Sequence, residues 1–177
     1  GFGFAGRVFH APLISATPGL RLAVVGSSQR ETVASMYPDA EVVADPHVAV
    51  AHPDVDLVVI ATPNDSHAPL AESAMRAGKH VVVDKPFTIT LADARMLARL
   101  ATDLERHVAV FQNRRWDSDF QGVSRELAAG RVGDVVELRS EFSRFRPEVR
   151  DRWRERPGPG SGMWYDLGPH LIDQALV

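Results

Sequence analysis

Gly1-Phe2-Gly3-Phe4-Ala5-Gly6 opens the chain and decides how the rest of it is interpreted. The stretch has the spacing G-x-G-x-x-G, and residues 5–16 are predicted to form a helix directly behind it. In a dinucleotide-binding loop the first glycine makes a tight turn, the second lets the backbone approach a pyrophosphate, and the third lets helix and strand pack closely. The same spacing also occurs in flexible turns, so the motif indicates a dinucleotide-binding loop only together with the sequence that follows it.

Strand-like and helical segments alternate through residue 111. Residues 55–61 are nearly continuous apolar and β-branched, which is typical of a parallel strand that is covered on both faces. The other predicted strands are 21–26, 41–43, 80–84 and 107–111, and the helices between them are 30–36, 46–51, 66–77 and 91–105. This alternation predicts an α/β domain with a Rossmann-type parallel sheet over residues 1–112.

The pattern changes near Asn113, where we place a domain boundary. Residues 117–130 and 163–177 are predicted to be helical, and Asp134 to Phe145 alternates as one long strand. The Arg-, Pro- and Gly-rich residues 146–162 are predicted to form an irregular loop. Residues 113–177 are therefore expected to be the beginning of a second domain, of the α+β class.

The composition excludes several classes of protein. The 177 residues are 45% hydrophobic and carry a net charge of -3, which fits a packed core and disfavours a general nucleic-acid binder. The absence of cysteine excludes disulfides and thiol chemistry. No apolar run approaches the length of a membrane span and no signal segment is present, so we expect a cytoplasmic protein without a nucleic-acid or membrane partner.

Both ends of the chain are expected to be cut. The first residue is Gly1 rather than Met, and the helical pattern from His170 to Val177 has no cap. The first strand of the sheet should end at Gly1, so the strands at 21–26 and 55–61 would face a gap. We therefore expect these 177 residues, expressed alone, to be aggregated or molten and catalytically inactive.

The tip of the 21–26 strand lies where a dinucleotide fold recognises the ribose. NAD-binding chains usually place Asp or Glu there, whereas this chain has Gly26-Ser27-Ser28-Gln29-Arg30. Two hydroxyls and a guanidinium suit a 2′-phosphate, which favours NADP and leaves NAD possible. In the alternative interpretation, Ser27 caps the next helix and Arg30 is only a solvated residue.

Two further strands end in unusual residues, Thr62-Pro63-Asn64-Asp65-Ser66-His67 and Asp84-Lys85-Pro86. Ligands of an open parallel sheet bind outside the carboxyl ends of its strands. Lys85 is one of only two lysines beside eighteen arginines, and a lysine can take part in proton transfer, whereas arginine stays charged. The alternative is an ordinary solvated lysine in a loop.

Asp166 and His170 are spaced i and i+4, so they share one face of the last helix. A histidine near neutrality is the usual general acid or base. The alternatives are a helix N-terminal aspartate beside a buried histidine, or a metal site. We predict no metal, because no third ligand lies at close spacing.

Together these motifs resemble the glucose-fructose oxidoreductase / inositol dehydrogenase / rhizopine catabolism (Gfo/Idh/MocA) family. The likeness covers the whole chain, and Asp84-Lys85-Pro86 replaces the family's usual Glu-Lys-Pro. Three more stretches resemble the bacterial branch that contains NADP-dependent scyllo-inositol dehydrogenases: Phe9-His10-Ala11-Pro12, residues 113–120 and Asp151-Arg152-Trp153-Arg154.

The resemblance implies an NAD(P)-dependent dehydrogenase acting on CH-OH groups of a cyclitol or sugar, with a scyllo-inositol-like substrate favoured. It implies a Rossmann domain followed by an open, mostly antiparallel sheet, through which the protein would form a homo-oligomer. The implied catalytic residues are Lys85, Asp166 and His170. The implied cofactor-binding residues are Gly1, Gly3, Phe4, Ala5, Gly6, Ser27, Ser28, Arg30, Thr62, Pro63, Asn64, His67, Lys85, Pro86 and Asn113.

Four residues are hypothesised to line the substrate pocket, because sugars pack on aromatic faces and bond to charged groups: Trp116, Arg152, Trp153 and Trp164. Two rival functions stay open. One is a non-catalytic nucleotide-binding or regulatory protein of the same fold, which could lose the acid–base residues that are present here. The other is a reductase of the same family with a non-sugar substrate.

Overall fold

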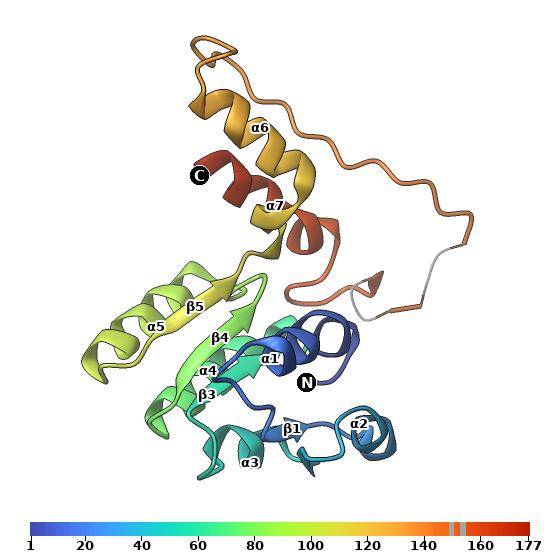
Figure 1. Ribbon diagram of the computed structural model, residues 1–177, viewed down its shortest axis with the longest axis vertical. Coiled ribbons are helices and arrows are strands. Elements are labelled where there is room, and N and C mark those ends of the chain that lie inside the picture. The colour runs from blue at the N-terminus through green and yellow to red at the C-terminus, as the bar shows by residue number, and fades with distance from the viewer. Residues whose placement is uncertain (149–150, 153–154) are drawn as a thin grey trace. The chain divides into compact units, whose positions relative to one another are not determined.

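The computed structural model describes residues 1–148, 151–152 and 155–177 of the chain (Figure 1). The chain divides into two compact units, Gly1–Phe111 and Gln112–Val177.

The first unit contains two parallel sheets with helices between the strands, which confirms the predicted Rossmann-type α/β fold. One sheet pairs β1 (Val24–Gly26) with β2 (Glu41–Val43), and the other has the order β3-β4-β5, with β3 at Leu57–Ile60, β4 at His80–Asp84 and β5 at Val108–Phe111. The helical elements are η1 (Gly6–His10), α1 (Ala11–Ala16), α2 (Arg30–Met36), α3 (Pro46–Ala51), η2 (Asn64–Ser66), α4 (His67–Arg76) and α5 (Leu91–Asp103).

Short local signals set the ends of these helices. The Thr90 side chain accepts a hydrogen bond from the backbone N–H of Asp93 and so caps α5, as Asp45 caps α3 through His47 N–H. Gly78 follows α4 with a φ of 82°, the left-handed conformation that a glycine adopts at low cost. These signals explain why the predicted helices lie close to their predicted bounds.

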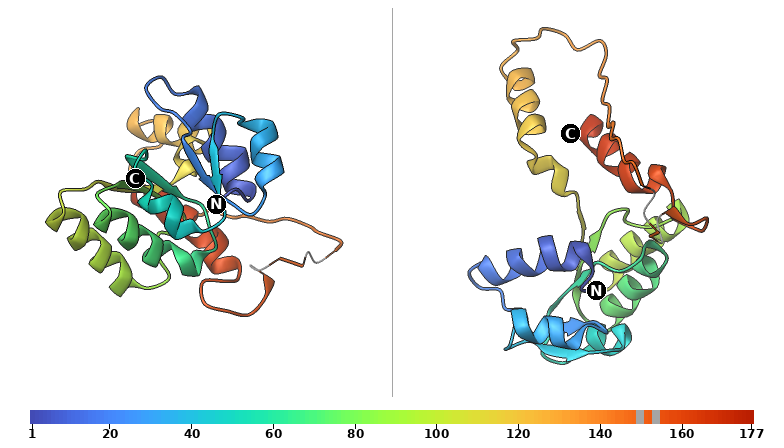
Figure 2. Two further views of the ribbon diagram at one scale, coloured as in Figure 1. Left: turned by 90° about the horizontal axis from the view of Figure 1, so that it is seen from below. Right: turned by 90° about the vertical axis from the view of Figure 1, so that its right-hand side faces the viewer.

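The main core lies between the β3-β4-β5 sheet and helices α4 and α5, which lie side by side (Figure 2). The strands contribute Val58, Ile60, Val81 and Val83, and Leu97 of α5 is completely buried against them. Because β3 and β4 are held by this packing and by their ladders, the turns that follow them are fixed in position.

A groove of about 380 Å³ separates β1 from β3. The two strands are not hydrogen-bonded to each other, and both line the groove together with Gly1, His10 and Ile14. The predicted gap beside the 21–26 and 55–61 strands is thus present within Gly1–Phe111, all of which the structure describes. Regular strand structure in 21–26 is limited to the three residues that pair with β2.

The second unit contains η3 (Asn113–Trp116), α6 (Ser118–Ala128) and α7 (Met163–Leu176). The predicted strand Asp134 to Phe145 is wrong for this structure, which assigns no strand to those residues. An alternating pattern forms a strand only when a second strand satisfies its backbone, and here Val136 and Phe145 are 95% and 92% exposed. No helix in the described part of the chain is both long and apolar enough to cross a membrane.

Candidate functional site

The glycine-rich loop contains two glycines that the protein's own packing requires and one that it does not. A Cβ atom on Gly1 would lie 2.5 Å from the carbonyl oxygen of Ala61, and one on Gly6 would collide with the carbonyl oxygen of Gly1. A Cβ on Gly3 would meet no atom within 4 Å, and Gly3 has no positive φ. The backbone at Gly3 is therefore open on the side where a side chain would stand.

The tip of β1 is tied to this loop. The Gln29 side-chain amide donates to the carbonyl oxygen of Phe2 at 3.3 Å, and the Ser27 hydroxyl oxygen accepts the backbone N–H of Gln29 at 3.0 Å. The Arg30 guanidinium donates to the carbonyl oxygen of Val42 at 2.8 Å, while Ser28 and Arg30 are exposed. Ser27 and Arg30 thus have structural contacts and still lie at the predicted ribose position.

The turn after β3 folds back on itself. The Ser66 hydroxyl lies 2.6 Å from the Thr62 hydroxyl and 2.7 Å from the carbonyl oxygen of Pro63. Asn64 is buried, with 5% of its surface exposed. This turn also approaches the glycine loop, because Ala61 and Thr62 are the residues that a Cβ on Gly1 would meet.

His67 connects this turn with the turn after β4. Its Nδ1 lies 2.8 Å from the carbonyl oxygen of Pro86, and its Nε2 lies 3.0 Å from the carbonyl oxygen of Thr62. The side chain is 1% exposed. The imidazole therefore connects the two turns from the protein interior and is not exposed to solvent.

Lys85 stands at the carboxyl end of β4 and is half-buried. The Asp84 carboxylate accepts the backbone N–H of Lys85 at 2.9 Å, and the Lys85–Pro86 peptide bond is cis. The hydrogen bond to Asp84 restrains the backbone from which the lysine side chain extends.

His10 is a site residue that the sequence analysis did not assign a role. It ends the π-helical turn η1, is 6% exposed, and packs on Phe111 with ring centroids 4.2 Å apart. Burial lowers the pKa of its imidazole, and the Asp84 carboxylate opposes this shift. Its spacing of four from Gly6 and from Ile14 was the available signal, since it predicts one inward helix face.

Asp166 and His170 lie on α7 of the second unit, at the predicted spacing. His170 is 6% exposed, and Asp166 lies in the first turn of the helix. Asp166 and Arg152 also line a hollow of about 320 Å³ with Arg144, Arg146 and Glu155. The hollow therefore has three guanidinium groups and three carboxylates in its lining, the carboxylates belonging to Glu148, Glu155 and Asp166.

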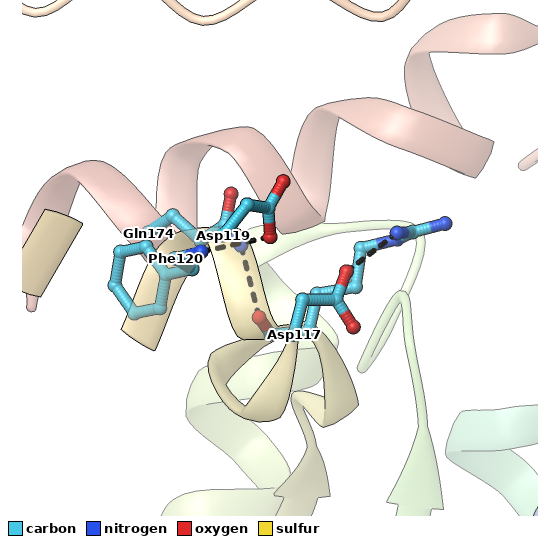
Figure 3. A network of polar contacts seen from close by, with 5 residues as sticks. Asp117, Asp119, Phe120 and Gln174 are labelled. Atoms are coloured by element: carbon cyan, nitrogen blue, oxygen red, sulfur yellow. Dashed lines mark hydrogen bonds and ion pairs between the residues drawn. The ribbon is translucent and has the colours of Figure 1, made fainter. Parts of the chain in front are cut away.

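The segment that begins at Asn113 is joined to α7 by polar contacts (Figure 3). Gln174 donates to the carbonyl oxygen of Arg114 at 2.9 Å, and Arg114 pairs with Asp117 at 2.7 Å. Arg115 binds Asp173 through two hydrogen bonds of 2.6 and 2.7 Å, which raise the pKa of Arg115. Asn113 is therefore held next to the helix that carries Asp166 and His170.

The hypothesised substrate residues differ in their surroundings. Trp116 and Trp164 are 80% and 68% exposed, which is unusual for tryptophan, and Gly168 leaves room for the Trp164 ring against α7. Arg152 pairs with Glu155. Trp153 lies outside the described residues.

The structure brings the predicted cofactor-binding residues of the first unit into one connected set. Gln29 links the β1 tip to the glycine loop, Gly1 touches the end of β3, and His67 links the ends of β3 and β4. Asn113, Asp166 and His170 belong to the second unit. The predicted catalytic residues are thus divided between the two units.

Residues 1–112 match the oxidoreductase family with an NAD-binding Rossmann fold, Gfo/Idh/MocA, and residues 120–177 match the Gfo/Idh/MocA C-terminal domain. The chain is 57% identical over its full length to the uncharacterized oxidoreductase YdgJ of Escherichia coli K12, of which it covers 51%. It is 38% identical, over 99% of its length, to the scyllo-inositol 2-dehydrogenase (NADP(+)) IolW of Bacillus subtilis, of which it covers 49%.

Among solved structures, an NAD-binding protein from Listeria innocua superimposes with a TM-score of 0.88 at 35% identity, covering 99% of this chain and 52% of that one. The chain thus spans about half the length of the curated relatives it matches.

Proposed function

Because the chain belongs to the Gfo/Idh/MocA oxidoreductase family, we propose that the whole protein transfers a hydride between NADP(H) and a secondary alcohol of a cyclitol or sugar. In this proposal residues 1–112 bind the dinucleotide, and residues 113–177 belong to the domain that binds the substrate. Residues of both domains would then contribute to the chemistry.

The observation that carries this proposal is the open backbone at Gly3. Packing accounts for Gly1 and Gly6, whereas neither packing nor a positive φ accounts for Gly3. A glycine without an internal reason is expected where a ligand approaches the main chain, and in this motif that ligand is a pyrophosphate. The residues present therefore fit a dinucleotide.

The choice of NADP is supported by the β1 tip. No acidic residue stands at Gly26-Ser27-Ser28-Gln29-Arg30 to accept the 2′-hydroxyl of NAD. Arg30 and the exposed Ser28 offer donors to a 2′-phosphate instead. The relative IolW is named as an NADP(+) enzyme, which agrees with this choice.

The residues of this chain would divide the acid–base work. A nicotinamide cofactor held by residues 1–112 would supply the hydride-transfer chemistry. His170 accepts the proton of the substrate hydroxyl, and Lys85 stabilises the negative charge that develops on the oxygen. Asp166 orients the substrate or His170. The exposed faces of Trp116 and Trp164, with Arg152 in the hollow beside Asp166, provide the stacking surfaces and donors that a polyol needs.

A scyllo-inositol-like cyclitol is the favoured substrate, on the likeness to IolW and to the inositol 2-dehydrogenase of Rhizobium meliloti, which is 34% identical over 99% of this chain. We further propose that the whole protein assembles into a homo-oligomer through an antiparallel sheet of its second domain.

Two measurements on the whole protein test the function. NADP-linked turnover should appear on a panel of inositols and aldoses, highest for an inositol, and absence of turnover on every member would contradict the proposal. Gly3→Ala should weaken NADP(H) binding with little change in thermal stability. The matched variant Gly6→Ala should destabilise the protein itself, because its Cβ has no space.

A further inference from the structure

His67 has a hydrogen-bond geometry that a neutral histidine cannot satisfy. It is the first residue of α4, and its two ring nitrogens face two different main-chain carbonyl oxygens. The distances are 2.8 Å from Nδ1 to Pro86 O and 3.0 Å from Nε2 to Thr62 O. Both lie within the normal range for an N–H donor and a carbonyl acceptor.

A carbonyl oxygen can only accept, so each of the two ring nitrogens must donate. A neutral imidazole has one N–H and one lone pair, and only the imidazolium has two N–H groups. In the neutral form one lone pair would face a carbonyl lone pair at about 3 Å inside the protein, where water cannot intervene, since the side chain is 1% exposed. The two carbonyl oxygens would each accept from one N–H group of the imidazolium.

We propose that His67 is a positioning residue held as an imidazolium, whose two N–H groups tie the turn after β3 to the turn after β4. The role assigned here differs from direct contact with the cofactor, because both ring nitrogens are occupied by the protein. This positioning role rests on the proposed function in one respect, because it assumes that the two turns face the bound dinucleotide.

The consequence for the site is geometric and electrostatic. Thr62 and Pro86 are the residues held, so the tie sets the spacing between Asn64 on one turn and Lys85 on the other. It also places a fixed positive charge beneath the surface where an anionic dinucleotide would lie. The ionisable groups here are Asp65 on η2, Glu72 and Arg76 along α4, and Asp84 and Lys85 beside Pro86.

The charge state can be observed without any activity measurement. The whole protein, labelled with ¹⁵N only in histidine, should show protons on both ring nitrogens of His67 at pH 7. The signals are assigned by their loss in His67→Phe, and the exposed His47→Phe serves as the control. A His67 ring with a single N–H at pH 7 would overturn the imidazolium.

The positioning role is tested by affinity. His67→Phe removes both hydrogen bonds between the two turns, so it should weaken NADPH binding by about tenfold. His67→Gln keeps one hydrogen-bond donor and should weaken NADPH binding by less. A folded His67→Phe protein with wild-type affinity would overturn this role. If His67→Phe does not fold, the comparison of His67→Gln with His47→Phe decides it. A wild-type protein that binds no nicotinamide dinucleotide would contradict the proposed function, while the proton count on His67 would still stand by itself.

Discussion

The two units of the chain are stabilised in different ways. In the first unit, side chains such as Ile60, Met75 and Leu97 are at most 2% exposed, and the buried hydrophobic residues found in the described part of the chain all lie between Phe2 and Ala101. In the second unit, apolar side chains from Trp116 to Val177 remain at the surface. The first unit is therefore held by apolar burial, whereas the second depends on polar contacts.

Polar contacts of this kind position side chains without contributing much stability. The paired hydrogen bonds between Arg115 and Asp173 fix η3 against α7, yet Arg115 is exposed to water, which screens the interaction. The two units therefore differ in how they hold their side chains. In the first unit the packed core fixes the carboxyl ends of the strands. In the second unit the packing of the described residues holds the side chains less firmly.

The largest expected effect concerns these 177 residues expressed by themselves. The groove between β1 and β3 leaves the facing edges of two strands without a sheet partner, and the second unit exposes Val136 and Phe145. Each buried backbone group without a partner costs about 1–3 kcal/mol, against a typical total stability of about 5–15 kcal/mol. We expect no cooperative thermal transition and strong binding of a hydrophobic dye. A sharp calorimetric transition together with NADP-linked activity would refute this expectation.

The next largest effect concerns Lys85, the predicted catalytic residue that belongs to the first unit. In the whole protein, Lys85→Ala should lower turnover by roughly 10²–10⁴, the usual loss for a positioned charge-stabilising or acid–base group. NADP(H) affinity should fall much less. Lys79, the only other lysine, follows α4 and is half-buried like Lys85, so Lys79→Ala is a matched control that should leave turnover unchanged. A loss of less than tenfold for Lys85→Ala would make it a structural lysine.

The contrast between apolar and polar stabilisation can be measured directly. Leu97 is 0% exposed in the main core, so Leu97→Ala should lower the unfolding free energy of the whole protein by about 2–5 kcal/mol, through lost burial and the cavity left behind. Arg115→Gln removes the paired hydrogen bonds to Asp173 at the surface and should cost clearly less. Equal losses in denaturant titrations would show that the second unit is stabilised as firmly as the first.

Much of the first unit follows from its sequence, because its signals are local. The apolar run 55–61, the cap at Thr90 and the glycine at position 78 each act within a few residues, and the observed strands and helices lie where these signals place them. The strand expected at Asp134 to Phe145 failed because strand formation depends on a partner that a pattern alone does not supply.

The site shows the same limit. The glycine loop and the strand ends were found from their spacing, because parallel strands bring their carboxyl ends to one edge. Spacing could not show that the two nitrogens of His67 bind Thr62 and Pro86, or that His10 packs on Phe111, since these contacts join residues far apart in the chain. The roles of Lys85, Asp166 and His170 stay predictions.

The smallest expected effect concerns the choice between NADP and NAD. The whole protein should bind NADP more tightly than NAD, because the segment from the end of β1 to Arg30, the first residue of α2, contains no carboxylate. One terminal nitrogen of Arg30 already donates to Val42 O, so this bond orients the guanidinium and leaves its other N–H groups for a 2′-phosphate. Losing one charge-assisted contact should narrow the preference by about tenfold in Arg30→Ala. Arg21, exposed at the opposite end of the same strand segment, gives the control Arg21→Ala, which keeps the net charge change and should keep the preference. Titration of both variants with both cofactors decides the point: equal affinities in the wild type, or an unchanged preference in Arg30→Ala, would leave Arg30 with only its structural bond to β2.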